Sequence, residues 1–254
     1  MDPLPDVDQT LYKSIMVLEA VARASEPSGV TELADRLGLT KSNTHRILRG
    51  FVALGYVRAL ERGRYEITSK LWELGVGFFA KLDIHRVCEP HMARISEATR
   101  ETVLLSVLEG DEVLFLAMIE SPHTVRAYTA VGERAAAAYV ASGRVQLAWA
   151  DEATVARARS TLRPRTSRSL VDPGALDAQL ALTRQRGYGI SEGEWVENAN
   201  SIAVPVRDAS GRIVAGIGIA GPADRLDAAA YGRYGPLMLS IGIEVSALLG
   251  HKAP

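Results

Sequence analysis

The chain has 254 residues, of which 47% are apolar and 23% charged, so one large or two modest domains with their own cores are expected. The net charge of −1 excludes binding of polyanions over the whole surface, and no apolar run reaches the roughly 18 residues of a membrane span. The acidic start lacks the order of a signal peptide and Cys88 is the only cysteine, so we expect a reducing, cytoplasmic location and no membrane partner.

Three helices are predicted at the N-terminus. Apolar residues at helical spacing predict an amphipathic helix over 10–24. Thr31 is expected to cap a second helix that stops at Gly38, and Thr40 is expected to cap a third helix over 41–54.

The third predicted helix has two chemically distinct faces. One is an apolar stripe at helical spacing, made of Thr44, Ile47, Leu48 and Phe51. The other face and the first turn carry hydrogen-bond donors and cations, namely Lys41, Ser42, Asn43, His45, Arg46 and Arg49. Such a face, on a helix that follows a tight turn, is typical of major-groove recognition.

A hairpin is predicted over 56–67, and a further helix over about 69–82. Arg62 and Arg64 of the hairpin are placed to reach flanking phosphates. From residue 36 to residue 70, eight Lys and Arg residues stand against two Glu residues, a surplus of six positive charges. This local basic patch favours phosphate binding. The alternative is a helical bundle with a solvated basic surface.

From residue 84 onward, strands and helices interleave with antiparallel hairpins, which predicts an α+β domain. Helices are expected at 85–99, within 135–150 after a small-residue loop, and at 151–160, 173–186 and 227–250. Strands are expected at 102–110, 111–121, 124–132, 187–191, 201–208 and 212–222.

Several motifs in order resemble the IclR family of bacterial transcription regulators. They are "GVTELADRLGLTKSNTHRILRGFVALGYV", "GRYEIT", "VASGRVQLAWA" and "RGYGISEGEWVENANSIAVPVRDASGRIVAGIGIAGPADR". The resemblance implies a winged helix-turn-helix domain (1–68), a linker helix (69–83) and a GAF-like effector-binding and oligomerisation domain (84–254). It also implies pairing through the DNA-binding domains, often as dimers of dimers, on a pseudo-palindromic double-stranded operator, with no cofactor.

The resemblance further implies a small-molecule effector pocket, formed by the loop before the Gly-Arg helix and by the late strands. Carried over by position, together with two candidate aromatic packing partners, its residues are Tyr139, Ser142, Gly143, Ser191, Glu192, Trp195, Asn200, Ser201, Gly218 and Ala220.

The chain departs from the family pattern at that pocket. Ala136 and Ala138 replace a common Pro and His, and Gly218 and Ala220 replace a common Ser-x-Ser pair. A small organic anion needs several donors to offset its desolvation. Their loss therefore predicts a roomier cavity for an aromatic or bulky apolar effector, the alternative being that the alanines simply fill a core.

Three other patterns point to weaker alternatives. "GIGIAG" (216–221) matches a dinucleotide motif, but its glycines lie in a predicted strand and not in a turn before a helix. His85, Cys88 and His91 have helical spacing but no fourth metal ligand nearby. Glu192, Glu194 and Glu197 are expected in a solvated loop.

The resulting prediction is a ligand-responsive DNA-binding transcriptional regulator that is not an enzyme and holds no metal. Two alternatives belong to other classes of protein. One is a small-molecule-transforming α+β enzyme with an accessory basic module, which the missing catalytic motifs disfavour. The other is a winged-helix protein-interaction module, which the basic surplus disfavours.

Overall fold

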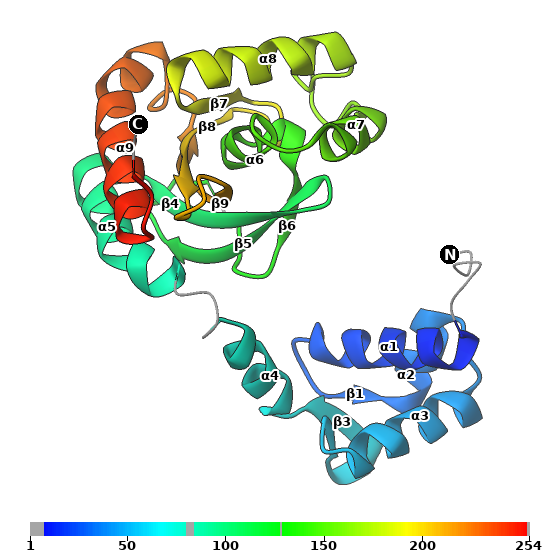
Figure 1. Cartoon of the computed structure of the whole chain (residues 1–254). Coiled ribbons are helices and arrows are strands. Elements are labelled where there is room, and N and C mark those ends of the chain that lie inside the picture. Colours follow the sequence, from blue (N-terminus) through cyan, green and yellow to red (C-terminus); the bar gives the residue numbers. More distant parts are fainter. Residues whose placement is uncertain (1–7, 80–83, 128, 253–254) are drawn as a thin grey trace. The chain divides into compact units, whose positions relative to one another are not determined.

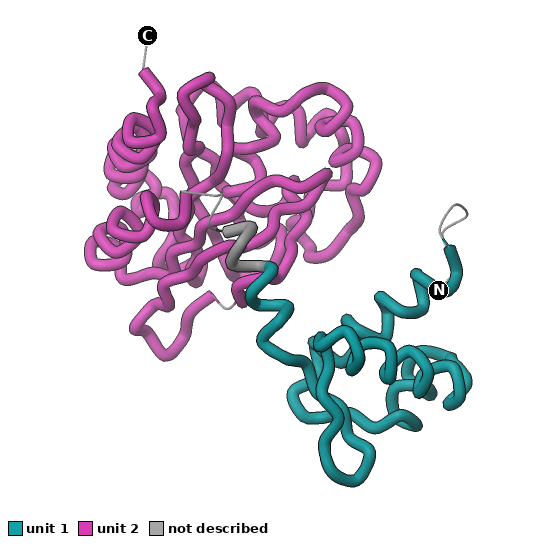
Figure 2. The backbone as a smooth tube through the Cα atoms, turned by 60° about the horizontal axis from the view of Figure 1, so that its bottom comes forward, with its two compact units in different colours: residues 1–82 teal, residues 83–254 magenta. Residues whose placement is uncertain are grey.

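The computed structural model describes residues 8–79, 84–127 and 129–252, with the backbone alone for 75–79. Two compact units divide the chain, residues 1–82 and residues 83–254 (Figure 2). None of the described helices is both long and apolar enough to cross a membrane.

The N-terminal unit combines helices with a small antiparallel sheet (Figure 1). Its helices are α1 (Gln9–Ala22), α2 (Val30–Leu37), α3 (Lys41–Ala53) and α4 (Lys70–Phe79). Its strands, in the spatial order β1-β3-β2, are β1 (Ser28–Gly29), β2 (Val57–Ala59) and β3 (Arg64–Ile67). The predicted helices and hairpin are confirmed, and positions 80–82 of the last predicted helix lie outside the described residues.

The helix ends follow the predicted chemistry with one exception. Gly38 adopts a left-handed conformation (φ 65°) after α2, and Thr40 Oγ1 accepts a hydrogen bond from the Asn43 amide at 3.3 Å. The prediction that Thr31 caps α2 is wrong. The cap is Gly29, because β1 pairs with β3 at this residue and holds it extended until the helix begins at Val30.

The core of this unit is built by the apolar faces of α1, α2 and α3. Val17, Leu33 and Leu48 are each 0% exposed, and Val57 and Tyr65 of the hairpin close the same cluster. Burying one such aliphatic side chain contributes about 1.5–3 kcal/mol. The packed core therefore fixes which face of α3 remains outside.

The C-terminal unit is an α+β domain, as predicted. Its helices are α5 (Ile84–Thr99), α6 (Ala141–Leu147), α7 (Glu152–Ser160), α8 (Pro173–Arg186) and α9 (Ala228–Leu248). Its strands are β4 (Thr102–Glu109), β5 (Glu112–Ile119), β6 (Arg134–Ala136), β7 (Gly189–Glu192), β8 (Ala199–Arg207) and β9 (Ile213–Pro222).

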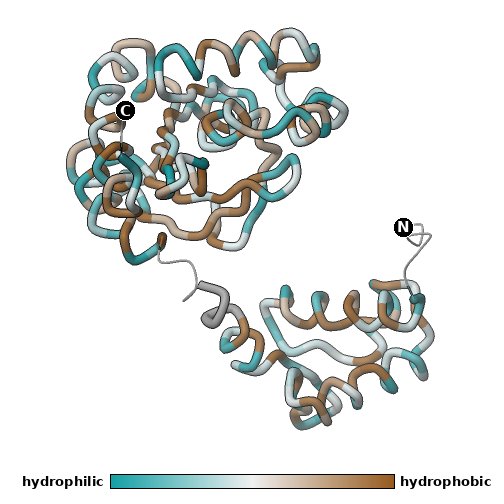
Figure 3. Tube along the Cα trace, in the orientation of Figure 1, coloured by the Kyte–Doolittle hydropathy of each residue, from teal (hydrophilic) through white to brown (hydrophobic). Residues whose placement is uncertain are grey.

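The six strands form one antiparallel sheet in the order β6-β5-β4-β9-β8-β7, with α5 and α9 on one side and α6 on the other (Figure 1). Figure 3 shows hydrophobic residues along the strands and mixed hydropathy along the outer helices. Gly189 and Gly216 let α6 lie close to the sheet, because a Cβ at either position would come within 2.7 Å of a carbonyl oxygen of α6.

The prediction of a strand over 124–132 is wrong for its described residues, which are loop. The edge of β5 is instead occupied by the shorter β6, whose pairs include Arg134 with Leu114. This loop is fixed to the start of β4, because Thr102 Oγ1 donates a hydrogen bond to the Ala127 carbonyl at 3.0 Å.

Candidate DNA-binding surface and effector cavity

Helix α3 presents its polar face to solvent. Thr44 and Leu48 are 0% exposed and turned into the core. The opposite positions are exposed, and they carry Lys41, Ser42, His45, Arg46 and Arg49, while Asn43 is half-buried. The burial pattern thus separates the two faces where the sequence predicts, and leaves donors and cations together on the exposed face.

Arg46 is already oriented on that surface. One of its terminal guanidinium nitrogens donates to Asn43 Oδ1 at 3.0 Å, one turn earlier in the same helix. The remaining donors of the guanidinium are available for a base edge or a phosphate. Planar donors held in this way suit bidentate contacts with guanine.

The two arginines predicted at the wing have different surroundings. Arg64 pairs with Glu32 of α2 at 3.0 Å and so ties β3 to the helix-turn-helix. Arg62 lies in the turn between β2 and β3 in a left-handed conformation (φ 58°), exposed and, within the described part of the chain, without an acidic partner. Arg62 is therefore the freer of the two cations.

A cavity lies in the C-terminal unit beside the start of α6, with about 660 Å³ of space that is partly open to solvent. Its lining is mostly apolar, with hydroxyl and amide groups interspersed, and among the described residues it includes no Lys, Arg or His. The apolar part includes Leu104, Phe115, Tyr139, Val140, Trp195, Ile202 and Ile219, and the polar part includes Thr102, Thr129, Ser142, Ser191, Asn200 and Ser201.

Eight of the ten residues predicted for the effector pocket line this cavity: Tyr139, Ser142, Ser191, Trp195, Asn200, Ser201, Gly218 and Ala220. Gly143 and Glu192 do not belong to the lining. Gly143 faces the 3-10 turn Ala137–Tyr139, where a Cβ would lie 2.2 Å from the Ala137 carbonyl oxygen. Glu192 follows Ser191 in β7, so its side chain points to the other side of the strand, where it is exposed.

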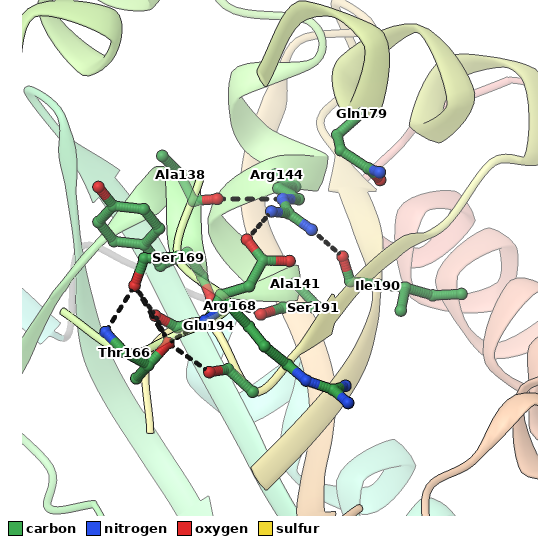
Figure 4. Close-up of polar contacts among 12 residues, drawn as sticks. Ala138, Ala141, Arg144, Thr166, Arg168, Ser169, Gln179, Ile190, Ser191 and Glu194 are labelled. Atoms are coloured by element: carbon green, nitrogen blue, oxygen red, sulfur yellow. Dashed lines mark hydrogen bonds and ion pairs between the residues drawn. The ribbon is translucent and has the colours of Figure 1, made fainter. Parts of the chain in front are cut away.

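A buried ion pair stands next to the cavity and was not predicted. Arg144 of α6 is 1% exposed, and its guanidinium pairs with the carboxylate of Glu194 (Figure 4). Arg144 Nε also donates to the Ala138 carbonyl at 3.0 Å, and another nitrogen donates to the Ile190 carbonyl. Burial raises the pKa of Glu194, and the charge of Arg144 opposes that rise.

The expectation of a solvated carboxylate loop is therefore wrong for Glu194, which is 7% exposed, while Glu192 and Glu197 are exposed. The available signal was Arg144, the one charged residue in a helix of otherwise uncharged residues. A buried arginine requires an acidic partner, but the sequence does not say which acidic residue supplies it.

The remaining sequence patterns occupy structural positions. Gly216 and Gly218 lie within β9 and not in a turn that opens a helix, as a dinucleotide site requires. Cys88 is 0% exposed, and burial raises the pKa of its thiol to about 12. The described residues contain no group of three or more His, Cys, Asp or Glu side chains that could hold a metal ion.

A winged helix-turn-helix with an exposed cationic helix, joined in one chain to a domain with an apolar cavity, defines a ligand-responsive transcription regulator. Comparison with known families agrees. Residues 10–61 match the IclR helix-turn-helix domain, and residues 77–247 match the bacterial transcriptional regulator IclR C-terminal domain. The chain belongs to the IclR family.

Individual relatives span nearly the whole chain. It is 31% identical to the HTH-type transcriptional regulator KdgR of Escherichia coli (strain K12), over 99% of this chain and 96% of that protein. It is 34% identical to KdgR of Dickeya chrysanthemi, over 89% of this chain and 74% of that protein. These relatives are named transcriptional regulators and not enzymes, which decides against the enzyme alternative.

Among solved structures, the chain is similar to an IclR homolog from Microbacterium hydrocarbonoxydans complexed with 4-hydroxybenzoate. The TM-score is 0.83 at 26% identity, and the match covers 95% of this chain and 99% of that one. The protein is thus an IclR-type transcriptional regulator with a helix-turn-helix DNA-binding domain and a C-terminal effector domain.

Proposed function

We propose that this regulator reads a pseudo-palindromic operator with α3 inserted in the major groove. The supporting observation is the burial of Thr44 and Leu48, which turns Ser42, Arg46 and Arg49 outward together. Selection of bound fragments from genomic DNA, followed by gel-shift titration, tests the proposal. Indifference to every duplex at low ionic strength would refute it.

We assign DNA binding to residues 1–68, and effector binding with oligomerisation to residues 84–254. Residues 69–83 link the two and transmit effector occupancy to the DNA-binding domain. Residues 80–83 of the transmitting segment lie outside the described residues. Because operator DNA lies in the bacterial cytoplasm, the regulator works there. Effector occupancy changes DNA binding only if the effector has different affinities for the two states of the protein.

Self-association through the N-terminal unit is supported by apolar side chains on its outer helices. Leu11 and Ile15 of α1 are 57% and 43% exposed, and Trp72 and Leu74 of α4 are 70% and 57% exposed. Exposed apolar residues on two helices are typical of an interaction surface. A two-fold dimer matches a palindromic operator, and the family resemblance implies that such dimers often pair into tetramers. Sedimentation equilibrium of the purified protein would distinguish monomer, dimer and tetramer.

The effector is an aromatic or otherwise bulky organic molecule with few polar groups. Two features support this class: the cavity lining has no cationic residue within the described part of the chain, and Tyr139, Trp195 and Phe115 supply aromatic surface. The 4-hydroxybenzoate bound to a structural relative is a molecule of this class.

Calorimetric titration with aromatic acids and short keto acids tests that class. We expect binding of at least one aromatic acid and no measurable heat with glyoxylate, because the cavity offers a small anion no charge to replace its hydration. Tight binding of glyoxylate alone would refute the aromatic class. It would favour the alternative, in which Ala136 and Ala138 only fill the core.

The wing arginines are expected to differ in their contribution to DNA binding. Arg62→Ala should weaken operator binding about threefold and reduce the slope of affinity against salt by about one, because a free phosphate contact is lost. Arg64→Ala should change both much less, because its guanidinium is held by Glu32 at 3.0 Å. Anisotropy titrations over a salt series measure both variants. Equal losses would contradict the difference between the two sites.

A further inference from the structure

One outer loop contacts two of the three described aromatic residues that line the cavity, Tyr139 and Trp195. The Arg163 amide donates to Tyr139 Oη at 2.6 Å, and Tyr139 Oη donates to the Arg163 carbonyl at 2.8 Å. Arg165 Nε donates to the Trp195 carbonyl at 2.9 Å, and its guanidinium carbon lies 3.6 Å from the centre of the indole ring. Tyr139 and Trp195 are thus tied to the same segment, residues 163–169, which we call the strap.

The strap is also bonded to the loop between β7 and β8, which carries Trp195. Thr166 Oγ1 donates to the Gly193 carbonyl at 2.7 Å, and Ser169 Oγ donates to the Glu194 carbonyl at 2.8 Å. Figure 4 shows Thr166 and Ser169 gathered around this loop. Backbone carbonyls fixed in this way hold the loop at a defined distance from the strap.

The same loop is anchored from the inside by the ion pair. Glu194 turns its carboxylate toward Arg144, which in turn binds the carbonyls of Ala138 and Ile190 (Figure 4). Ala138 precedes Tyr139, so a single guanidinium joins the turn that carries Tyr139 to the loop that carries Trp195. Neither Arg144 nor Glu194 lines the cavity.

We propose that Glu194 and Arg165 are positioning residues for effector recognition, which set the placement of Trp195 relative to Tyr139. Glu194 fixes the loop from the protein interior through Arg144, and Arg165 holds the indole ring from the outside. This inference rests on the proposed function of the cavity as an aromatic effector site. Effector recognition thereby depends on two residues that do not line the cavity.

The fluorescence of Trp195 tests the positioning without any ligand. The other two tryptophans, Trp72 and Trp149, are 70% and 37% exposed, so replacing both by phenylalanine leaves Trp195 as the single reporter. In this background, Glu194→Gln and Arg165→Ala should each raise acrylamide quenching of Trp195 by about twofold, because the loop opens locally.

Glu197→Gln is the matched control. Glu197 lies in the same loop and accepts hydrogen bonds from the Ser167 amide at 3.0 Å and its hydroxyl at 2.7 Å. It is exposed, and the amide oxygen of a glutamine can accept both bonds, so the contact with the strap is kept. We expect wild-type quenching for this variant. If Glu194→Gln does not fold, Arg165→Ala alone tests the proposal, because Arg165 is exposed and its loss leaves no buried charge unpaired. Unchanged quenching in a folded Arg165→Ala protein, or equal effects of Glu194→Gln and Glu197→Gln, would overturn the proposal.

Calorimetry with 4-hydroxybenzoate extends the test to recognition. Glu194→Gln and Arg165→Ala should bind this probe about tenfold more weakly than wild type, while Glu197→Gln binds as wild type does. Weaker binding with an unchanged melting temperature in Arg165→Ala separates positioning from loss of structure. If the wild type does not bind the probe, the aromatic class proposed for the effector fails for this compound, while the quenching result still decides the positioning role.

Discussion

Replacement of Arg46 by alanine is expected to weaken operator binding by about 10- to 100-fold, the value of one good bidentate base contact. The guanidinium is exposed on α3 and held by Asn43 Oδ1 at 3.0 Å, so little side-chain entropy remains to be lost on binding. Asn43→Ala should cost less, because it frees the arginine without removing it. Anisotropy titrations at one fixed salt concentration measure both variants.

Arg23→Ala is the matched control for charge. Arg23 lies at the end of α1, is exposed, and pairs with Glu19 at 3.2 Å. Its removal changes the net charge by the same amount as Arg46→Ala, but it touches no part of α3. If the two variants bind the operator equally well, α3 is not the recognition helix.

Helices α1, α2 and α3 of the N-terminal unit were predictable because each buries a periodic apolar face. Val17, Leu33 and Leu48 anchor three helices, and the same burial leaves the polar face of α3 outside. The start of α2 was not predictable from local capping chemistry. Gly29 takes the cap because β1 pairs with β3, and Arg64 lies opposite Gly29 only after the chain has folded.

The prediction of a strand over 124–132 failed because a strand also needs a neighbouring strand with which to pair its backbone. Residues 124–132 contain the β-branched and aromatic residues of a strand, but propensity supplies no hydrogen-bonding edge. The edge of β5 is reached only after Gly132 (φ 88°), whose amide bonds to the Phe115 carbonyl at 2.8 Å, and β6 then continues the pairing.

The cavity was predicted in outline because resemblance locates segments, but it does not say which side chain of a segment faces inward. Ser191 and Glu192 are neighbours in β7 and point to opposite sides, so only Ser191 lines the cavity. Glu194 escaped prediction because its burial depends on Arg144, fifty residues away in the sequence. A cluster of three glutamates predicts a solvated loop until that partner is known.

Gly143→Ala is expected to destabilise the C-terminal unit by about 3 kcal/mol or more, the upper range for overpacking. The new Cβ would lie 2.2 Å from the Ala137 carbonyl oxygen and 2.4 Å from its Cα, and backbone atoms cannot rotate away as a side chain can. The 3-10 turn would have to move, and Tyr139 at its end would move with it. Thermal unfolding and calorimetry with 4-hydroxybenzoate measure the two consequences.

Gly232→Ala places the same methyl group in a helix where it meets nothing. Gly232 is exposed on α9, and no described heavy atom beyond its own helix lies within 4 Å of the added Cβ. Stability should therefore rise by about 0.5–1 kcal/mol, since alanine loses less conformational entropy than glycine in a helix. Should Gly143→Ala melt like the wild type and lose only ligand affinity, Gly143 would contact the effector directly, as the family resemblance implies, and would not act by packing.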